Sequence, residues 1–438
     1  MMDNGAQVRP LEKRTSPLRY AVGMFGTSMP INMFKAYAMD FYVVKLGLST
    51  SRYALILFLY TFVDAIDNPV YGFLSDRTRT RWGRRRPWLI LGAPLLALAF
   101  ILFYNPPALA GEGALFVYML LTYILTGTLD SLINANYGAL FPELFHGENV
   151  RAKTNAMRQA FQLVAMVISL ALTPVVAGGL GYANTAIIYS ALAVAVILFC
   201  ATGCKEDMHV QETKKPPLWG SLKALAANPL FWVYGLCNAF YSAAMAMVMQ
   251  SVPLFVKYSL GLGGVATMML QGIVLLLAVA SMALWAFMVR RFSLMRTWRG
   301  ALILLGASFL PLYFMNSLPG AVAASAFVGI GMAGVMATMD LIGARIMDED
   351  TRKYGLRREG IYSSAMGVLN RLSGLFVSLG VLLAARLYGF ESGELPGPDP
   401  GGAARFMLTL FPAMAMAVSC LFSWILNFRD ISAGQSEA

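Results

Sequence analysis

The sequence predicts an all-α integral membrane protein with twelve transmembrane helices arranged as two six-helix bundles. Three observations support this class: the composition of the 438 residues, the succession of apolar runs, and the distribution of basic residues between the runs. Hydrophobic residue types make up 58% of the chain and charged residues only 13%, with a mean hydropathy of +0.62. This balance excludes a water-soluble enzyme, a nucleic-acid binder and a secreted scaffold.

Twelve apolar runs, each long enough to cross a bilayer as a helix, account for most of the chain. They cover residues 18–46, 52–75, 87–106, 114–141, 154–177, 184–203, 228–256, 264–289, 299–316, 320–344, 360–388 and 404–428. The longest hydrophilic interruption separates six spans from six. The predicted parts are an N-terminal tail (1–17), an N-terminal bundle (18–203), a central cytoplasmic loop (204–227), a C-terminal bundle (228–428) and a C-terminal tail (429–438).

The basic residues test this count of spans. Of the 34 Lys and Arg residues, 25 fall in the tails and in the loops after even-numbered spans, five in the loops after odd-numbered spans, and four inside spans. Cytoplasmic loops of membrane proteins carry the excess of Lys and Arg. The bias therefore predicts a multi-pass protein of a bacterial inner membrane, or its equivalent, with both termini in the cytoplasm.

Two short motifs recur in the second half of the chain. The triplet Leu46–Leu48 after the first span recurs as Leu260–Leu262 after the seventh, at an offset of 214 residues, and the pair Arg79–Thr80 recurs as Arg296–Thr297, at an offset of 217. Coincidence between short helix-end motifs is the alternative. A repeat favours two bundles that face each other around a central cavity and rock to give alternating access.

The cysteines and histidines indicate no cofactor and no catalytic site. Cys200, Cys204, Cys237 and Cys420 lie in or at the ends of apolar runs, and we interpret them as reduced packing residues. Both histidines lie in hydrophilic connections, so a proton carrier inside the membrane is expected to be a carboxylate. We predict that the protein is not an enzyme.

Charged side chains at membrane depth are costly, so each one is a functional candidate. Asp64 and Asp67 stand three residues apart in the second span, and Asn68 follows on the same helical face. Two close carboxylates repel each other, which favours binding of a proton or Na⁺ between them. The alternative is a structural ion pair of one carboxylate with Lys35 or Arg158, and the two roles are compatible.

A second oxygen-bearing patch lies in the fourth span. Asp130, Ser131 and Asn134 are spaced so that they share a face that could lie opposite the first patch. Monovalent and divalent cations prefer such oxygen ligands. Na⁺ is the one metal ion expected here, with H⁺ as the other candidate coupling ion.

Three basic residues lie inside predicted spans. Lys35, Arg158 and Arg371 would place positive charge near the cavity, where they favour either a solute with an acidic group or ion pairs between helices. Asp340 lies near the cytoplasmic end of its span, and we interpret it as a gate partner of Arg345.

The loop after the second span predicts a gate. Gly72 allows close helix approach, Asp76 can cap a neighbouring helix, and arginines such as Arg77 and Arg81 can bridge cytoplasmic helix ends in one conformer. A topogenic basic cluster is the alternative. A GxGxxG match at residues 329–334 lies within an apolar span, so we interpret it as small residues for helix packing.

These residues resemble the glycoside-pentoside-hexuronide:cation symporters, a family of the major facilitator superfamily typified by the melibiose permease. The most specific match is Val63–Gly72 followed by Asp76–Trp88, which resembles that family's DAxxDPxxG and RxRxGRxRPW signatures. Supporting matches are Leu46–Ser49, Tyr123–Gly127, Leu140–Pro142, Arg158, and the block from Asp350 to Arg371. The resemblance spans most of the chain and implies the major facilitator fold.

In that family, carboxylates on helices 1, 2 and 4 serve sugar and cation binding. The helix 2 acid corresponds to Asp64, whereas the acid before the proline is replaced by Asn68, with an acid displaced to Asp67. The helix 4 acid falls on Asn134, and Asp130 stands one turn away.

The remaining family positions lose one more acid and keep their positive charges. The hydroxyl ligand position is Ser131, the helix 1 sugar-binding acid falls on Ser28, and Lys35 occupies a cavity-facing family position. The helix 11 lysine of the family is Arg371. These changes argue against a neutral disaccharide with Na⁺, and they favour an acidic glycoside, a uronide or another anionic solute with proton coupling.

We therefore predict H⁺- or Na⁺-coupled symport of a sugar-like solute, such as a glycoside or uronide, by a monomer in contact with membrane lipid and not with nucleic acid. The candidate solute-binding residues are Ser28, Lys35, Asp64, Asn134, Arg158 and Arg371. The candidate cation-coupling residues are Asp64, Asp67, Asn68, Asp130, Ser131 and Asn134. The alternatives are an uncoupled facilitator, a transporter of lysolipids or drugs, which the methionines at 245, 247 and 249 favour, and a non-transporting scaffold.

Overall fold

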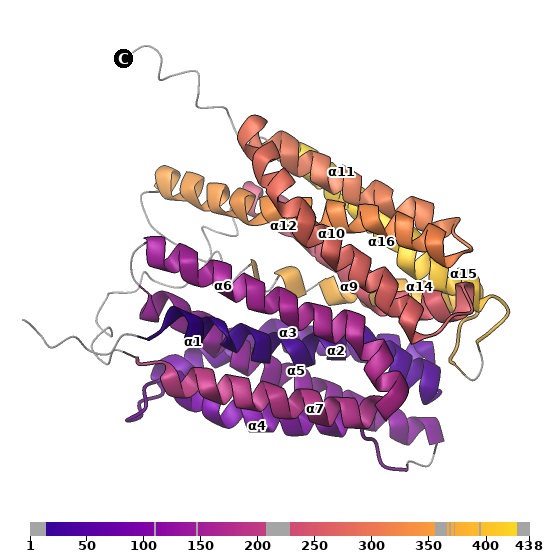
Figure 1. Ribbon diagram of the computed structural model, residues 1–438, viewed down its shortest axis with the longest axis horizontal. Helices are drawn as coiled ribbons and strands as arrows, with labels where there is room; N and C mark the ends of the chain where they lie inside the picture. Colours follow the sequence, from indigo (N-terminus) through magenta and orange to yellow (C-terminus); the bar gives the residue numbers. More distant parts are fainter. Residues whose placement is uncertain are drawn as a thin grey trace, which may run out of the picture.

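The computed structural model describes residues 15–108, 111–145, 148–206, 228–354, 366–367, 369–371, 373–393 and 396–426, and the regular secondary structure of these residues is helical. Most of the predicted central loop, from 207 to 227, lies outside the described residues. Figure 1 shows the helices of the first half of the chain, indigo to magenta, gathered beside those of the second half, orange to yellow.

The first half contains six predicted runs, and each coincides with a helical span. Its helices are α1 (Pro17–Ala21), α2 (Gly23–Met39), η1 (Asp40–Lys45), α3 (Thr50–Arg77), α4 (Arg86–Phe103), α5 (Gly111–Leu144), α6 (Glu148–Met166), η2 (Val167–Leu172) and α7 (Thr173–Gly203). Gly181, with a φ of +81°, breaks α7. The residues before this break continue the span of α6 and η2, and the residues after it form the next span.

The second half repeats this layout. Its helices are α9 (Pro229–Leu254), η4 (Phe255–Ser259), α10 (Gly264–Arg291), α11 (Leu294–Tyr313), α12 (Leu318–Tyr354), α14 (Ser373–Tyr388), α15 (Pro400–Arg405), η5 (Phe406–Leu410) and α16 (Phe411–Ile425). Among the described residues, eight helical stretches have the length and hydropathy of a membrane span. The prediction of an all-α membrane protein is confirmed.

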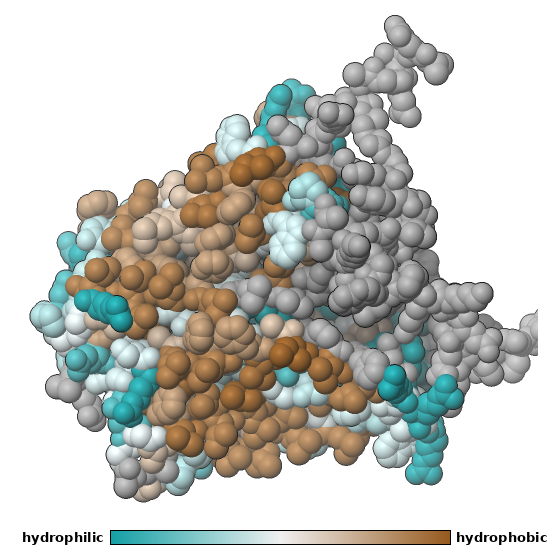
Figure 2. Space-filling model, turned by 180° about the vertical axis from the view of Figure 1, so that it is seen from behind, coloured by the Kyte–Doolittle hydropathy of each residue, from teal (hydrophilic) through white to brown (hydrophobic). Residues whose placement is uncertain are grey.

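Large apolar side chains cover the outside of both halves. Leu91, Leu121, Leu276 and Leu421 are 62% to 67% exposed although they lie in the middle of helices. Figure 2 shows apolar residues spread broadly over one face of the molecule. A soluble monomer rarely exposes so much apolar surface, so lipid is the environment that this surface fits.

The recurring triplet after the first and seventh spans folds in the same way in both halves. Each triplet follows a π-helical segment, η1 or η4, and its glycine has a positive φ, +77° at Gly47 and +65° at Gly261. The N–H of Leu48 donates to the carbonyl of Tyr42, and 214 residues later the N–H of Leu262 donates to that of Val256, at 2.9 and 3.0 Å. The matching hydrogen bonds favour a structural repeat over a chance similarity between two short sequences.

The two halves are joined at the end of the molecule where α3 begins, which we call the far end; Thr15 and Leu426 lie at the opposite end, the termini end. The N–H of Gly393 donates to the carbonyl of Val43 at 2.8 Å, and the N–H of Thr50 donates to that of Glu391 at 2.6 Å. A Cβ on Gly393 would lie 1.8 Å from the carbonyl oxygen of Val44, the residue after Val43. Only glycine fits this close approach.

Further contacts between the halves follow α3 from the far end to its middle. The hydroxyl of Tyr53 donates to Oε1 of Gln250, and the hydroxyl of Ser378 donates to the carbonyl of Ala54, both at 2.7 Å. Among the residues that the structure describes, the last contact in this series is made by Asp64, near the middle of α3. The far end is therefore held closed to about the middle of the span.

Within the second half, the GxGxxG match serves helix packing, as predicted. A Cβ on Gly329 would lie 2.3 Å from the carbonyl oxygen of Val274 in α10, and one on Gly331 would lie 2.7 Å from Cα of Leu305 in α11. The glycines therefore let α12 approach both neighbours.

Candidate solute and cation site

An ion pair between the two halves forms the centre of the site. Nη1 of Arg371, just before α14, donates to Oδ1 and to the backbone carbonyl of Asp64 in α3. The same nitrogen lies 3.2 Å from Oγ of Ser131 in α5. Both charged side chains are partly exposed, 18% for Arg371 and 21% for Asp64. The pair is thus partly buried and partly open.

Two hydroxyl groups complete the surroundings of the Asp64 carboxylate. The hydroxyls of Tyr60 and Ser131 each donate to Oδ1 at 3.2 Å. Gly374 lets α14 approach α3 next to this carboxylate. A Cβ on Gly374 would lie 2.4 Å from Oγ1 of Thr61, one turn before Asp64 in α3. The carboxylate is therefore held by one charged and two neutral donors.

A second acid lies next to this pair and belongs to the first half. Nδ2 of Asn134 donates to Oδ1 of Asp130 at 2.6 Å, as expected for residues one turn apart in α5. Lys35, on α2, has an exposed side chain and interacts electrostatically with Asp130, as do Asp64 and Arg371. The structure thus brings together six of the residues selected from the sequence: Lys35, Asp64, Asp130, Ser131, Asn134 and Arg371.

Asp67 turns towards α5 and finds a different partner. Its Oδ2 accepts a hydrogen bond from the hydroxyl of Thr128 at 2.8 Å, and its residue is 9% exposed. Asp64 and Arg371 still act on it electrostatically. Thr128 was not selected from the sequence, although it lies one helical turn before Ser131 and so shares its face.

The structure places two other candidates away from this group. The guanidinium of Arg158 lies 5.9, 5.4 and 4.9 Å from the ring centres of Tyr20, Tyr137 and Phe141. These are cation–π distances, and the rings belong to the termini end of the first half. Ser28 is buried in α2 at 6% exposure. Among the described residues, no hydrogen bond joins either side chain to Asp64 or Asp130.

The loop between α3 and α4, residues 78–85, is stabilised by contacts within the first half, and we call it the arginine loop. Oε1 of Glu143 accepts from Nη2 of Arg84 at 2.6 Å and from Nε of Arg85 at 2.8 Å. The carboxylate of Glu206 accepts from the backbone N–H groups of Arg84 and Arg86, both at 2.8 Å. A carboxylate at the start of α4 is favourable because it meets free N–H groups and the positive end of the helix dipole.

These two glutamates were missed in the sequence because both lie far from the arginines along the chain, Glu143 near the end of α5 and Glu206 after α7. Of the predicted gate residues, Arg77 and Arg81 are exposed, and Arg81 lies 5.5 Å from the ring centre of Trp82. Arg345 is half-buried. The side chains of Asn68, Gly72, Asp76 and Asp340 lie outside the described part of the structure.

Comparisons with known proteins point to one family. A family described as MFS/sugar transport protein matches residues 19–431. The chain is 27% identical to an isoprimeverose transporter of Lactiplantibacillus pentosus over 396 residues, 83% of this chain and 80% of that one. It is 25% identical to a glucuronide carrier protein homolog of Escherichia coli over 423 residues, 94% and 92% of the two chains. Two further symporter relatives match over 42% and 54% of their own length.

A solved structure supports the fold. The crystal structure of a mutant of the nucleoside transporter NupG superposes on this chain with a TM-score of 0.70. The superposition covers 94% of this chain and 100% of that chain, at 11% sequence identity. At this identity the likeness concerns the arrangement of the helices alone.

Proposed function

Because the chain belongs to the MFS/sugar transport protein family, whose pattern it matches from residue 19 to 431, we propose that it carries a sugar-like solute together with a cation by alternating access. The chain is a membrane transporter and not an enzyme, and its relatives include sugar transporters of the glycoside-pentoside-hexuronide type. The predicted family and fold are confirmed. Cation coupling, the charge of the solute and the direction of transport belong to our proposal.

The observation that carries the proposal is the ion pair between Asp64 and Arg371. It joins the two halves at the middle of α3, and in the described part of the chain it is the last of the contacts that run from the far end. A proton or Na⁺ that binds Asp64 competes with the guanidinium for the same carboxylate oxygen. Binding of the cation therefore weakens the contact between the halves and releases Arg371.

The released guanidinium provides the solute site. Together with the exposed ammonium of Lys35, Arg371 would bind a carboxylate or sulfonate, since a guanidinium pairs well with planar acidic groups. The hydroxyl and amide groups of Ser131 and Asn134 would bind sugar hydroxyls. That one relative is named a glucuronide carrier homolog supports an anionic solute. Coupling then follows, because binding of H⁺ or Na⁺ to Asp64 frees the guanidinium of Arg371 to bind the solute.

The remaining candidates have supporting roles in this proposal. Asp67 and Asp130 lie close enough to Asp64 to attract the coupling ion, and we keep Asn68 as a candidate from its spacing in the sequence alone. The exposed Arg77 and Arg81 lie at the termini end, where they could meet the second half when that end closes. We assign the termini end to the cytoplasm from the excess of Lys and Arg there. Arg158 and Ser28 are positioned to support helix packing.

A ligand-binding screen tests this function. Purified protein would be heated with neutral sugars, uronic acids and lysolipids, at several pH values and with or without Na⁺. A ligand at about 100 times its Kd stabilises the folded protein by about 2.7 kcal/mol, enough to raise Tm by several degrees. We expect stabilisation by uronic acids that grows when Na⁺ or protons are added. Stabilisation by lysolipids alone would support the amphiphile transporter instead.

A further inference from the structure

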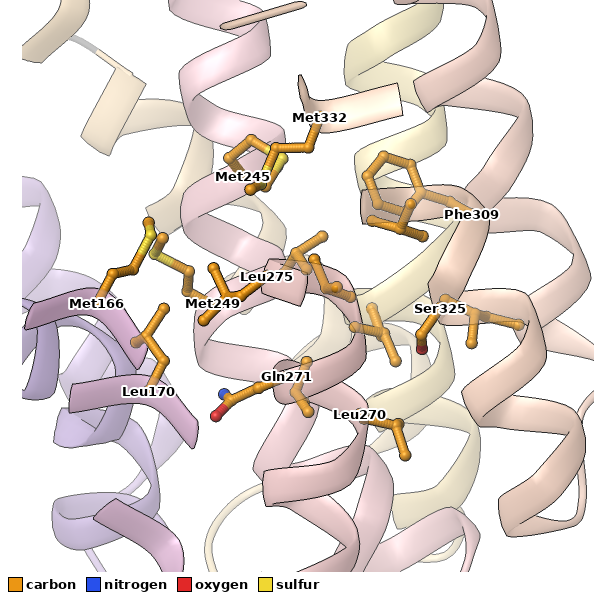
Figure 3. A pocket seen from close by; sticks show the side chains of 16 residues that line it. Met166, Leu170, Met245, Met249, Leu270, Gln271, Leu275, Phe309, Ser325 and Met332 are labelled. Atoms are coloured by element: carbon orange, nitrogen blue, oxygen red, sulfur yellow. The ribbon is translucent and has the colours of Figure 1, made fainter. Parts of the chain in front are cut away.

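Two cavities that border the second half differ in the size of ligand that they could hold. The cavity in Figure 3 lies against η2 and is lined by apolar side chains such as Met166, Met245 and Met249, but its volume is only about 50 Å³. A second cavity, between α10 and α11, has a volume of about 330 Å³. Sites for small ligands usually measure about 300 to 1,000 Å³. Of these two cavities, the second is therefore the one with room for a ligand.

The larger cavity is a groove beside the turn that joins α10 to α11. Its lining consists of Trp285, Met288, Phe292, Arg296, Thr297 and Gly300. Phe292 is 49% exposed, and Arg296 and Gly300 are exposed as well, so the groove is open to the outside. A Cβ on Gly300 would meet no described atom within 4 Å beyond its chain neighbours and its own helix backbone. The groove thus combines apolar walls, free space at a glycine and one cationic side chain.

The groove continues onto the lipid-facing surface of α11. Exposed residues of this helix, spaced three or four apart, form one stripe that consists of Arg296, Gly300, Ile303, Ala307 and Leu310. Ile303 is 50% exposed and Leu310 is 46% exposed. Such apolar side chains on the outer surface fit the acyl chains of lipid. A lipid whose chains lie on this stripe would place its headgroup at Arg296.

The turn between α10 and α11 lies at the termini end and is basic. The guanidinium of Arg299 donates to the carbonyl of Leu426 at 2.8 Å, which places the turn at this end. Arg290, Arg291 and Arg296 are exposed. No acidic residue occurs between residues 264 and 339, so neither α10 nor α11 can neutralise these arginines.

The arginine loop, which occupies the same place in the first half, has acidic partners within the chain. Glu143 pairs there with Arg84 and Arg85. In the described part of the second half, no such carboxylate is paired with Arg290, Arg291 or Arg296. An anion from outside the chain is therefore complementary to the second turn.

We propose that the groove between α10 and α11 binds the headgroup of an anionic phospholipid. The guanidinium of Arg296 pairs with the lipid phosphate, since guanidinium and phosphate groups form strong paired hydrogen bonds. The rest of the headgroup occupies the space at Gly300, and the acyl chains follow Ile303 and Leu310. The lipid comes from the cytoplasmic leaflet, to which we assign the termini end and whose surface is negatively charged. This site is separate from the solute site and does not depend on the proposed transport.

Lipid binding to the purified protein tests this site. The full chain in a neutral detergent would be titrated with dioctanoyl phosphatidylglycerol or dioctanoyl phosphatidylcholine, and the bound lipids would be counted by native mass spectrometry. We expect one phosphatidylglycerol molecule to bind about fivefold more tightly than phosphatidylcholine, since one basic residue beside an anionic headgroup contributes about this factor.

Two arginines of the same turn provide a matched pair of variants. Arg296→Gln removes the cation that lines the groove, whereas Arg291→Gln removes the same charge from an exposed residue outside the lining. Arg296→Gln should reduce the ratio of the two lipid affinities to about one. Arg291→Gln should change this ratio by less than about twofold, because an exposed charge outside the groove acts at longer range and is screened by salt.

The glycine in the groove provides an independent test. Gly300→Leu should weaken binding of phosphatidylglycerol about tenfold by filling the groove, and the fold should be kept because the space at this glycine is open. Ala307→Leu adds a side chain of the same size further along the stripe, outside the lining, and should leave the affinity within about twofold of the wild type.

Three outcomes would overturn the lipid site and leave the proposed transport standing. The first is equal affinity of the wild type for the two lipids. The second is an equal loss of preference in Arg296→Gln and Arg291→Gln, which would show only the general attraction of a basic turn to an acidic membrane. The third is binding of soluble glycerol 1-phosphate as tightly as phosphatidylglycerol, which would show that the groove holds a free phosphate and not a lipid.

Discussion

Helices α3 and α10 occupy corresponding places in the two halves and carry opposite kinds of side chain. The offset of 214 residues that pairs Gly47 with Gly261 pairs Asp64 with Ala278 and pairs Asp67 with residue 281, a serine. Ala278 is buried at 1% exposure. The shared helix ends show a common scaffold, and the side chains show that the two helices are used differently: α3 carries charged groups near its middle, whereas α10 carries Ala278 and Ser281 at the corresponding positions.

The comparison predicts that loss of the charged contact has the largest effect. Arg371→Gln removes the only charged donor that we find on Asp64 among the described residues. Hydrogen bonds between charged groups contribute about 1.5 to 3 kcal/mol, so affinity for an acidic glycoside should fall about 10- to 100-fold. Binding measured by calorimetry would check this.

Arg371→Lys provides the control, because it keeps the charge but loses the planar pair of donors. Its affinity should lie between those of the wild type and Arg371→Gln. An affinity for the acidic solute that both variants leave unchanged would place that solute elsewhere.

A smaller effect is expected at the arginine loop, which belongs to the scaffold of the first half. Glu143→Gln removes ion pairs with Arg84 and Arg85, whose side chains are 20% and 9% exposed. Partly exposed pairs contribute about 1 kcal/mol, so Tm should fall by a few degrees while solute affinity stays the same. The exposed Arg81→Gln, whose side chain lies over Trp82, is the control and should leave Tm unchanged. A fall in solute affinity in Glu143→Gln would connect the loop to the site.

The smallest effect is expected at the counterpart of Asp67 in α10. Oγ of Ser281 donates to the carbonyl of Leu277 in its own helix at 2.6 Å, so Ser281→Ala should change the free energy of unfolding by less than about 0.5 kcal/mol. Asp67→Asn should instead impair gradient-driven uptake. Equal losses of uptake in the two variants would show that α3 and α10 are not specialised in the way we describe.

The helices could be predicted from the sequence because a bilayer imposes a simple requirement on composition and length. Their limits were less predictable where polar residues extend a helix beyond the apolar run: α12 ends at Tyr354 and not at residue 344, and α11 begins at Leu294 and not at residue 299. The first patch of acids could be identified for a related reason, since a charge such as Asp64 is costly at lipid depth and is retained only where it has a function. The contact of Asp64 with Arg371 could not be predicted from spacing, because 307 residues separate the two side chains.

The direction of a side chain around its helix was the least predictable feature. Arg158 was selected as a charge inside a span, but no pattern in the sequence indicated the rings of Tyr20 and Tyr137 beside it. The contact of Gln271 with the hydroxyl of Tyr37 was also missed, because one amide in an apolar run has no periodic signal. Both environments depend on which helices become neighbours, and that information is not local.

Gradient-driven accumulation by Asp64→Asn tests the central claim most directly. The variant would be reconstituted in vesicles with an imposed proton or Na⁺ gradient. Asp40→Asn is the control, because Asp40 lies near the far end, where its Oδ2 accepts a hydrogen bond from the Tyr182 hydroxyl at 2.7 Å. We predict that Asp64→Asn abolishes accumulation above equilibrium, with expression and folding intact, whereas Asp40→Asn accumulates solute. Undiminished accumulation by Asp64→Asn would contradict the role of this carboxylate in coupling.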